Sequence, residues 1–507
     1  MSLGRHLLRG SGMNMLDLAV KTAAMFITTP LMIKGLGDTG YGSWLLVMSV
    51  TGYFLLIDMG MSFSATRFLA VALGKGDGER RRAILVAGTR FYRRAGFVVI
   101  GLTFLMMPLL PWLSPGHDDF SQACFCLGAT GCVTGARFLF RLPMIILRAH
   151  VRYDLLAAAS LCRVVLQTLV MCRALTHGGT LTHVALIHCA GEVAEMLLQA
   201  LFARNMEPRQ DGVDEDQLRQ TRSELFTYSR GIIAGAIGDN LRLQLNPFLI
   251  SRMQGLAQLP AYSIGTRLIT LLQDAVNALF GGQLLSAFGQ LHGAEESGRL
   301  RQQYLRVTHI TSGFSAAAMA GVVFLARPFL ERWVGPSLIP AYHVLLILAL
   351  PYALHFMQYP AYNLMYTIGR TQWVVWLCFA GGICSAVLSI ILGLRHGMTG
   401  IVLGSGIEMF VSRGLIMSWL VQRCTGVNAA RYLLGHVVWP GVKGALLPGV
   451  FALVTRHGVL PDYGSVLLHG AGYGVVFLLS FPWMVMDAEA RRLLWGHLPL
   501  VRRWGGG

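Results

Sequence analysis

Charged residues are scarce in this chain. Asp, Glu, Lys and Arg make up 13% of its 507 residues, whereas ordinary soluble domains carry about 25%. Hydrophobic residues account for 54%, and the mean hydropathy is +0.55. So low a share of charged residues, together with so high a share of hydrophobic residues, excludes a soluble enzyme, a disordered protein and a fibrous protein.

Motifs of soluble catalysis and of metal binding are missing as well. The sequence has no GxxxxGK(S/T), HExxH or GxSxG pattern, which excludes an ATP-driven pump with its own nucleotide-binding domain. The nine cysteines are odd in number and form no CxxC pair, so we expect no disulfide framework, no metal and no cofactor. The first apolar run carries Asp17 and Lys21, so we also expect no cleavable signal peptide.

Long apolar runs dominate the sequence. A membrane-spanning helix needs about 20 predominantly apolar residues, and glycine, which is common in membrane helices, contributes 59 residues. Turn-forming segments rich in Gly, Pro and Asp separate the runs. We therefore predict an all-α, polytopic membrane protein with about 14 spans, at 13–34, 42–64, 89–113, 119–141, 153–175, 180–203, 229–252, 260–284, 307–330, 341–366, 372–394, 398–421, 434–456 and 464–486.

Basic residues gather in the even-numbered loops between these spans and in both terminal segments. The second loop holds Arg80, Arg81 and Arg82, and the eighth holds Arg299 and Arg301, whereas the odd-numbered loops contain isolated cations only. Because cytoplasmic loops carry an excess of Lys and Arg, this alternation predicts that both termini lie in the cytoplasm. It also accounts for most of the formal net charge of +17 without a nucleic-acid partner.

Two pairs of prolines indicate an internal repeat. Pro30 and Pro247 both stand at the end of a predicted span, and their offset is 247 − 30 = 217; Pro143 and Pro360 give 360 − 143 = 217. A parallel repeat of six spans with a polar break at mid-chain is typical of two-bundle transporters. We expect an N-terminal six-helix lobe at 1–206, a cytoplasmic linker at 207–227, a C-terminal six-helix lobe at 228–424, and two further helices with a basic tail at 425–507.

Arginines within the predicted spans are the first candidates for a binding site. Arg137 and Arg141 stand at i and i+4 in the fourth span, which places them on one helix face, and Arg148 follows. Arginines that converge on a cavity can bind phosphate through paired hydrogen bonds. The alternative is that they extend to the cytoplasmic surface or pair with acids of a neighbouring span.

Polar residues of the seventh and eighth spans are the second group of candidates. Asn240 and Arg242 lie in the seventh span, and Arg267, Asp274 and Asn277 belong to one polar stripe of the eighth. Such a stripe is typical of the wall of a water-filled cavity. The alternative is interhelical hydrogen bonding that only holds the bundle together.

Acidic residues in the spans are candidates for coupling transport to an ion, because a membrane-embedded carboxylate must face protein or water. The alternative is simple neutralisation, with Asp58 paired to Arg67 and the two glutamates satisfied by arginines such as Arg163. The candidates are Asp58, Glu192, Glu195 and Asp239.

Two segments of the chain resemble a known family. The segment from Thr28 to Ala70 contains a proline-bearing helix end, the loop GLGDTGYGSW, and then IDMGMSFSATR, in which Asp58 and Arg67 stand. The segment from Leu245 to Leu272 contains LNPFLISRMQG and then AYSIGTRLITLL. Both segments are similar to bacterial polysaccharide flippases of the multidrug/oligosaccharidyl-lipid/polysaccharide exporter superfamily.

The resemblance implies a flippase of the bacterial cytoplasmic (inner) membrane. Its substrate would be a polyprenyl-pyrophosphate-linked oligosaccharide for O-antigen, exopolysaccharide or capsule synthesis, moved by alternating access through a cationic cavity between two lobes. Candidate partners are membrane lipids, a polysaccharide polymerase and a chain-length regulator. On this hypothesis the arginines contact the pyrophosphate or acidic sugars, and the amides and Asp274 bind sugar hydroxyls. The residues concerned are Arg137, Arg141, Arg242, Arg267, Asn240, Asp274 and Asn277.

Three other functions compete with this one. An ion-coupled drug or metabolite antiporter of the same superfamily predicts a cavity dominated by acids and aromatics, because its substrates are often cationic. A membrane polymerase or ligase of surface polysaccharide predicts a large extracytoplasmic loop, whereas every odd-numbered loop here is short. A structural scaffold for a synthesis complex is the last alternative.

Overall fold

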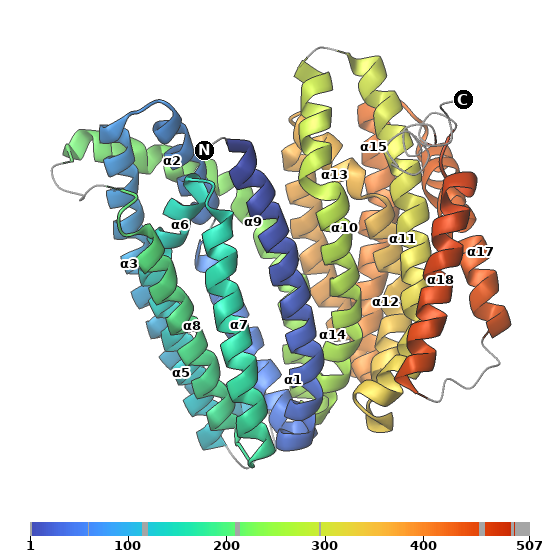
Figure 1. Ribbon diagram of the computed structural model, residues 1–507, viewed down its shortest axis with the longest axis horizontal. Coiled ribbons are helices and arrows are strands. Elements are labelled where there is room, and N and C mark those ends of the chain that lie inside the picture. Colours follow the sequence, from blue (N-terminus) through green and yellow to red (C-terminus); the bar gives the residue numbers. More distant parts are fainter. Residues whose placement is uncertain are drawn as a thin grey trace, which may run out of the picture. The chain divides into compact units, whose positions relative to one another are not determined.

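A computed structural model describes residues 3–58, 60–113, 120–207, 213–293, 296–455, 462–487 and Arg491. Throughout these residues the secondary structure is helical, with no strand (Figure 1). The chain forms two compact units, Met1–Pro260 and Ala261–Gly507. The predicted all-α membrane architecture is therefore confirmed, and each unit is described by itself.

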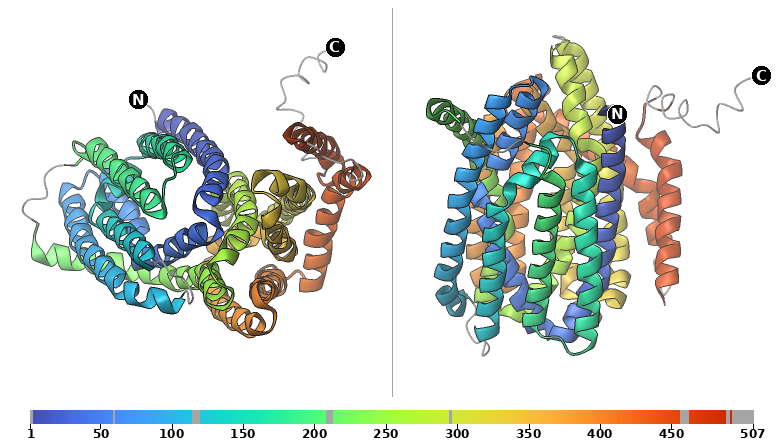
Figure 2. Two further views of the ribbon diagram at one scale, coloured as in Figure 1. Left: turned by 90° about the horizontal axis from the view of Figure 1, so that it is seen from below. Right: turned by 60° about the vertical axis from the view of Figure 1, so that its left-hand side comes forward.

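The first unit is built around long helices that lie alongside one another (Figure 2). Helix α1 packs against α7, α3 against α5, and α8 against both α5 and α7, while α9 contacts α1, α2 and α3. The elements are α1 (Leu3–Phe54), η1 (Leu55–Asp58), α2 (Met61–Gly74), α3 (Gly78–Met106), η2 (Met107–Leu109), α4 (Leu110–Leu113), α5 (Phe120–Leu139), α6 (Arg141–Ala149), α7 (Tyr153–Thr176), α8 (Leu181–Ala203), α9 (Glu215–Gln254) and η3 (Leu256–Gln258).

The second unit contains most of α10 and all later helices. Helix α11 packs against α12, α17 and α18, and α12 packs against α14. The elements are α10 (Leu259–Gly293), α11 (Ser297–Trp333), η4 (Pro336–Leu338), α12 (Pro340–Met357), α13 (Tyr359–Thr367), α14 (Thr371–Met409), the π-helical turn η5 (Phe410–Ile416), α15 (Met417–Thr425), α16 (Ala429–Arg431), the π-helical turn η6 (Tyr432–Val438), α17 (Trp439–Thr455) and α18 (Tyr463–Met484).

Two of the predicted connections between spans are single glycines at which two helices meet. Gly37 interrupts α1 with φ 69° and ψ 172°, and Gly397 interrupts α14 with φ 60° and ψ −141°. Residues with a side chain rarely adopt a positive φ, so glycine allows the chain to bend there without an extended connection. Each kink lies between two predicted spans.

Among the described residues, nine helices are long and apolar enough to cross a membrane, or ten if α5 and α6, bent by 47°, count as one broken span. Two of the nine run through the kinks at Gly37 and Gly397. Helices α9 and α10, which hold the predicted spans 229–252 and 260–284, are not among the nine. The multi-pass membrane protein is confirmed, whereas the count of 14 spans and the lobe boundaries stay predictions.

Candidate functional site

A cavity of about 720 Å³ lies within the first unit. Helices α1, α2, α5, α6, α7 and α8 all contribute lining residues, so packing of six sequence-distant segments creates it. Four of the lining side chains are cations, Lys21, Arg67, Arg137 and Arg148, and two are carboxylates, Asp17 and Glu195. The lining therefore carries a formal charge of 4 − 2 = +2.

Two of the four cations are neutralised by carboxylates. The ammonium of Lys21 lies 2.6 Å from Asp17 Oδ2, one helical turn away on α1, as the sequence spacing predicts. On α5, Arg137 forms an ion pair with Glu192 of α8. These pairs satisfy the requirement that charges inside a membrane protein find a partner or water.

The other two cations form no ion pair with a described residue. Neither Arg67 nor Arg148 forms an ion pair or a side-chain hydrogen bond with any residue that the structure describes. The guanidinium of Arg67 lies 4.6 Å from the ring centroid of Tyr228, an arrangement that leaves its charge intact. Both arginines are exposed, and both line the cavity.

An ion-pair network on α7 and α8 forms one wall beside the cavity. Arg163 Nε lies 2.6 Å from Glu195 Oε2, and Arg163 Nη1 lies 3.4 Å from Glu192 Oε1. Gln199 Nε2 donates a hydrogen bond of 2.9 Å to Glu195 Oε1. Both glutamates are buried. The predicted neutralisation of the two carboxylates by Arg163 is thus present, and Arg137 completes it.

Arg141 belongs to a different cluster. Its Nε donates to Ser62 Oγ at 3.0 Å and lies 3.9 Å from Asp58 Oδ1. Asp58 Oδ1 also accepts hydrogen bonds from Ser62 Oγ at 2.7 Å and from the hydroxyl of Tyr92 at 2.9 Å. Asp58 therefore pairs with Arg141, whereas the sequence suggested a pair with Arg67.

The expectation that Arg137 and Arg141 share one helix face is wrong. Helix α5 ends at Leu139, α6 begins at Arg141, and the two are bent by 47°. The bend separates the arginines, so that Arg137 lines the cavity and Arg141 is not among its lining residues. Arg148, at the far end of α6, reaches the cavity instead.

The remaining candidates lie on α9 and α10. Asn240 and Arg242 are half-buried on α9. On α10, Arg267 and Asp274 are exposed and Asn277 is half-buried. None of these five lines the cavity of the first unit. Their roles stay predictions; the side chain of Asp239 falls outside the described residues.

Sequence reasoning did not bring Lys21, Arg67 and Arg148 together, because they come from three different helices. The signal that could have singled out Arg67 is its place in the segment IDMGMSFSATR. No sequence spacing predicts that α1, α2 and α6 surround one cavity.

Comparison with known proteins places the chain in a family. A family model described as "Polysaccharide biosynthesis protein" matches residues 7–292, more than half of the chain. The chain belongs to this family. It is also 24% identical over 494 residues to the "Uncharacterized membrane protein EpsK" of Bacillus subtilis (strain 168), with 92% of this chain and 93% of that protein covered.

Solved structures show the same fold. The chain resembles "Lipid II flippase MurJ, inward closed conformation" with a TM-score of 0.70 and 12% identity, over 96% of this chain and 99% of MurJ. It also resembles an inward-facing "multidrug resistance MATE family transporter of the MOP superfamily" with a TM-score of 0.68 and 14% identity, over 81% of this chain and 98% of that one. The family resemblance drawn from the sequence is confirmed, and the fold is that of these membrane transporters.

Proposed function

We propose that this protein translocates a polyprenyl-pyrophosphate-linked oligosaccharide across the bacterial cytoplasmic membrane during surface polysaccharide synthesis. The observation that carries the proposal is the cavity of the first unit, where Arg67 and Arg148 have no anionic partner among the described residues. An uncompensated guanidinium in a membrane protein is costly unless water or a ligand satisfies it. A diphosphate supplies both the charge and the acceptor oxygens.

The chemistry of the four cations suits a diphosphate. A guanidinium presents a planar fork of donors that matches two phosphate oxygens, and Lys21 adds a compact charge. Arg67, Arg137 and Arg148 come from α2, α5 and α6, so they approach the cavity from different directions. This arrangement can hold both phosphate groups at once, while the polar residues predicted on α9 and α10 remain candidates for contact with the sugars.

The carboxylates of the same cavity argue against a cationic drug as the substrate. Only Asp17 and Glu195 line it, and both already have basic partners, Lys21 at 2.6 Å and Arg163 at 2.6 Å. A cationic substrate would have to displace one of these partners. We therefore favour the flippase over the antiporter of the same superfamily, and over an enzyme.

The position of the cavity fits loading from the cytoplasm. Arg67 stands on α2, whose end at Gly74 precedes the second loop, and Arg148 stands one residue before the end of α6, next to the fourth loop. These are basic loops that the positive-inside rule assigns to the cytoplasm. On this proposal both termini are cytoplasmic as well.

Genetic complementation tests the function. In a strain that lacks the gene, we expect surface polysaccharide to disappear and lipid-linked repeat units to accumulate on the cytoplasmic side. The wild-type gene should restore polysaccharide, as should a control with Arg173→Ala, which removes an exposed arginine near the end of α7. A double Arg67→Ala, Arg148→Ala variant at normal membrane level should not.

Other outcomes point to other functions. Lipid-linked repeat units that accumulate on the outer side would indicate a role in polymerisation. An unchanged glycan profile with new sensitivity to cationic compounds would indicate the antiporter. Normal polysaccharide from the double variant would refute the proposed role of the cavity.

A further inference from the structure

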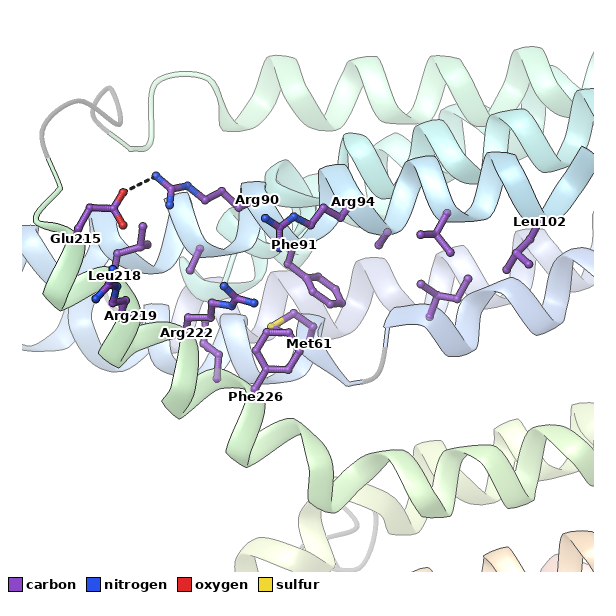
Figure 3. Close-up of a pocket in the computed structure, with 15 residues that line it drawn as sticks. Met61, Arg90, Phe91, Arg94, Leu102, Glu215, Leu218, Arg219, Arg222 and Phe226 are labelled. Carbon is purple, nitrogen blue, oxygen red and sulfur yellow. Dashed lines mark hydrogen bonds and ion pairs between the residues drawn. The ribbon is translucent and has the colours of Figure 1, made fainter.

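A second cavity in the first unit has a different character. It has a volume of about 480 Å³ and is lined by η1, α2, α3 and the N-terminal part of α9 (Figure 3). This volume falls within the ~300–1,000 Å³ range of small-molecule sites. None of the four cations of the proposed pyrophosphate site lines it, so the inference below does not rest on the proposed function.

One end of this second cavity is apolar. Ala95, Val98 and Leu102 follow one another along one face of α3, and Met61 of α2 and Phe226 of α9 lie opposite. Leu102 lies at the end of the cavity away from Glu215 (Figure 3). These side chains form an apolar slot. A hydrocarbon chain can occupy the slot without breaking any hydrogen bond.

The other end of the cavity is strongly basic. Arg90 and Arg94 of α3 face Arg219 and Arg222 of α9 (Figure 3). Glu215 is the one carboxylate among the lining residues, and it lies 3.0 Å from Arg90 Nη2. This basic end of the cavity, here called the rim, therefore carries a formal charge of 4 − 1 = +3.

Three of these arginines have no anionic partner among the residues that the structure describes. Arg94, Arg219 and Arg222 form no ion pair with any residue in the described part of the chain, and the guanidinium of Arg222 lies 5.8 Å from the ring centroid of Phe226. Extension of the arginines toward water would account for their exposure. It would not account for the apolar side chains that line the same cavity between α3 and α9.

We propose that this second cavity binds an anionic phospholipid. The phosphate would lie among Arg94, Arg219 and Arg222, and one acyl chain would run along Val98 toward Leu102. Basic pockets between membrane helices on the cytoplasmic side bind anionic headgroups in this way, and the predicted span begins at residue 89, beside the arginines. Because the lining comes from both α3 and α9, the bound lipid would hold these two helices together.

Lipid retention by the purified full-length protein tests the proposal. Native mass spectrometry in a mild detergent, with phosphatidylglycerol or phosphatidylcholine added at increasing concentration, gives an apparent Kd for each lipid. We expect wild type to retain phosphatidylglycerol preferentially. The triple variant Arg94→Gln, Arg219→Gln, Arg222→Gln should bind it about a hundredfold more weakly, because each basic residue near an anionic lipid contributes about fivefold.

A matched control removes the same three charges elsewhere. Lys75, Arg93 and Arg204 are exposed and do not line the cavity. Their replacement by glutamine should leave the apparent Kd within about twofold of wild type, since the rim cluster is untouched. Equal weakening in both triple variants would mean that net charge alone attracts the lipid, which would overturn the proposal.

Two further measurements separate a bound phospholipid from other anions. Val98→Trp keeps every arginine but fills the slot, so it should weaken phosphatidylglycerol binding as well; unchanged binding would show that no acyl chain enters. Glycerol phosphate, which lacks acyl chains, should not displace the lipid, and displacement would indicate an anion site only. If a polyprenyl phosphate binds to this cavity and phosphatidylglycerol does not, the proposal is overturned, and the cavity is a site for a prenyl chain.

Discussion

Replacing Arg148 by glutamine tests the cationic cavity most directly. In the absence of substrate this guanidinium is exposed and has no ion pair with the described residues, so its loss breaks no ion pair of the described fold. A change in substrate affinity can therefore be assigned to the missing charge. Glutamine keeps similar length and polarity, and it leaves one neutral donor in the same place.

The magnitude follows from the bonds that a guanidinium gives to phosphate. A hydrogen bond to a charged group contributes about 1.5–3 kcal/mol, and about 1.4 kcal/mol corresponds to a tenfold change in Kd. Glutamine retains a weaker donor, so the loss should lie at the lower end of this range. We expect Kd for a polyprenyl pyrophosphate to rise about 10- to 30-fold.

Isothermal titration of purified protein in detergent with a short prenyl pyrophosphate measures this Kd. Arg173→Gln is the matched control, because it also removes one exposed arginine but lies near the end of α7, away from the cavity. A prenyl alcohol without phosphate should bind equally well to wild type and to both variants. If Arg148→Gln binds the pyrophosphate within about twofold of wild type, the assignment of the cavity to the phosphates is refuted.

Three further substitutions test packing and backbone conformation through the midpoint of thermal unfolding in detergent. Glu192→Gln should lower it, because the change removes the buried carboxylate that pairs with Arg137 and costs about 3 kcal/mol. Gly42→Ala should lower it because the new Cβ would lie 2.0 Å from the carbonyl oxygen of Leu256, a clash that costs about 1–3 kcal/mol. Gly397→Ala should lower it because φ 60° and ψ −141° suit glycine alone, at about 1–3 kcal/mol.

Matched controls exist for each of these substitutions. Gly101 and Gly474 are helical glycines at which an added methyl group would meet no atom within 4 Å, so alanine there should leave the midpoint unchanged or raise it. Glu331→Gln breaks only an exposed pair with Arg327 and should change little. A midpoint for Glu192→Gln equal to that of Glu331→Gln would show that the buried network does not stabilise the unit.

The helical membrane architecture could be predicted because hydropathy is a local property of the sequence. Turn signals are local as well, and they place breaks between spans at Gly37 and Gly397. At both glycines the backbone leaves the helical conformation, and two helices meet there. Glycine suits these positions because the turn needs a positive φ that other residues rarely adopt.

The site could be predicted only in part. The Asp17–Lys21 pair was predictable from its i,i+4 spacing, and it is present at 2.6 Å. The convergence of Arg67 and Arg148 was not, because it depends on how α2 and α6 pack. The break between α5 and α6 moved Arg141 to Asp58. Pro143 is a sequence signal for such a break, because proline disfavours a continuous helix, but it does not predict which acid Arg141 meets.

Pairing explains which basic residues remain available to a substrate. A charge that is buried when the fold forms must be compensated within the fold. Arg163 and Arg137 therefore pair with Glu192 and Glu195. An anionic substrate could bind the whole guanidinium of Arg137 only after breaking its ion pair with Glu192. Arg148 has no ion pair with the described residues that a ligand would have to break. Arg137 and Arg141, which are conspicuous in the fourth predicted span, are consequently the poorer guide to the binding site. Arg148, one residue before the end of α6, where water can compensate its charge until a ligand arrives, is the better one.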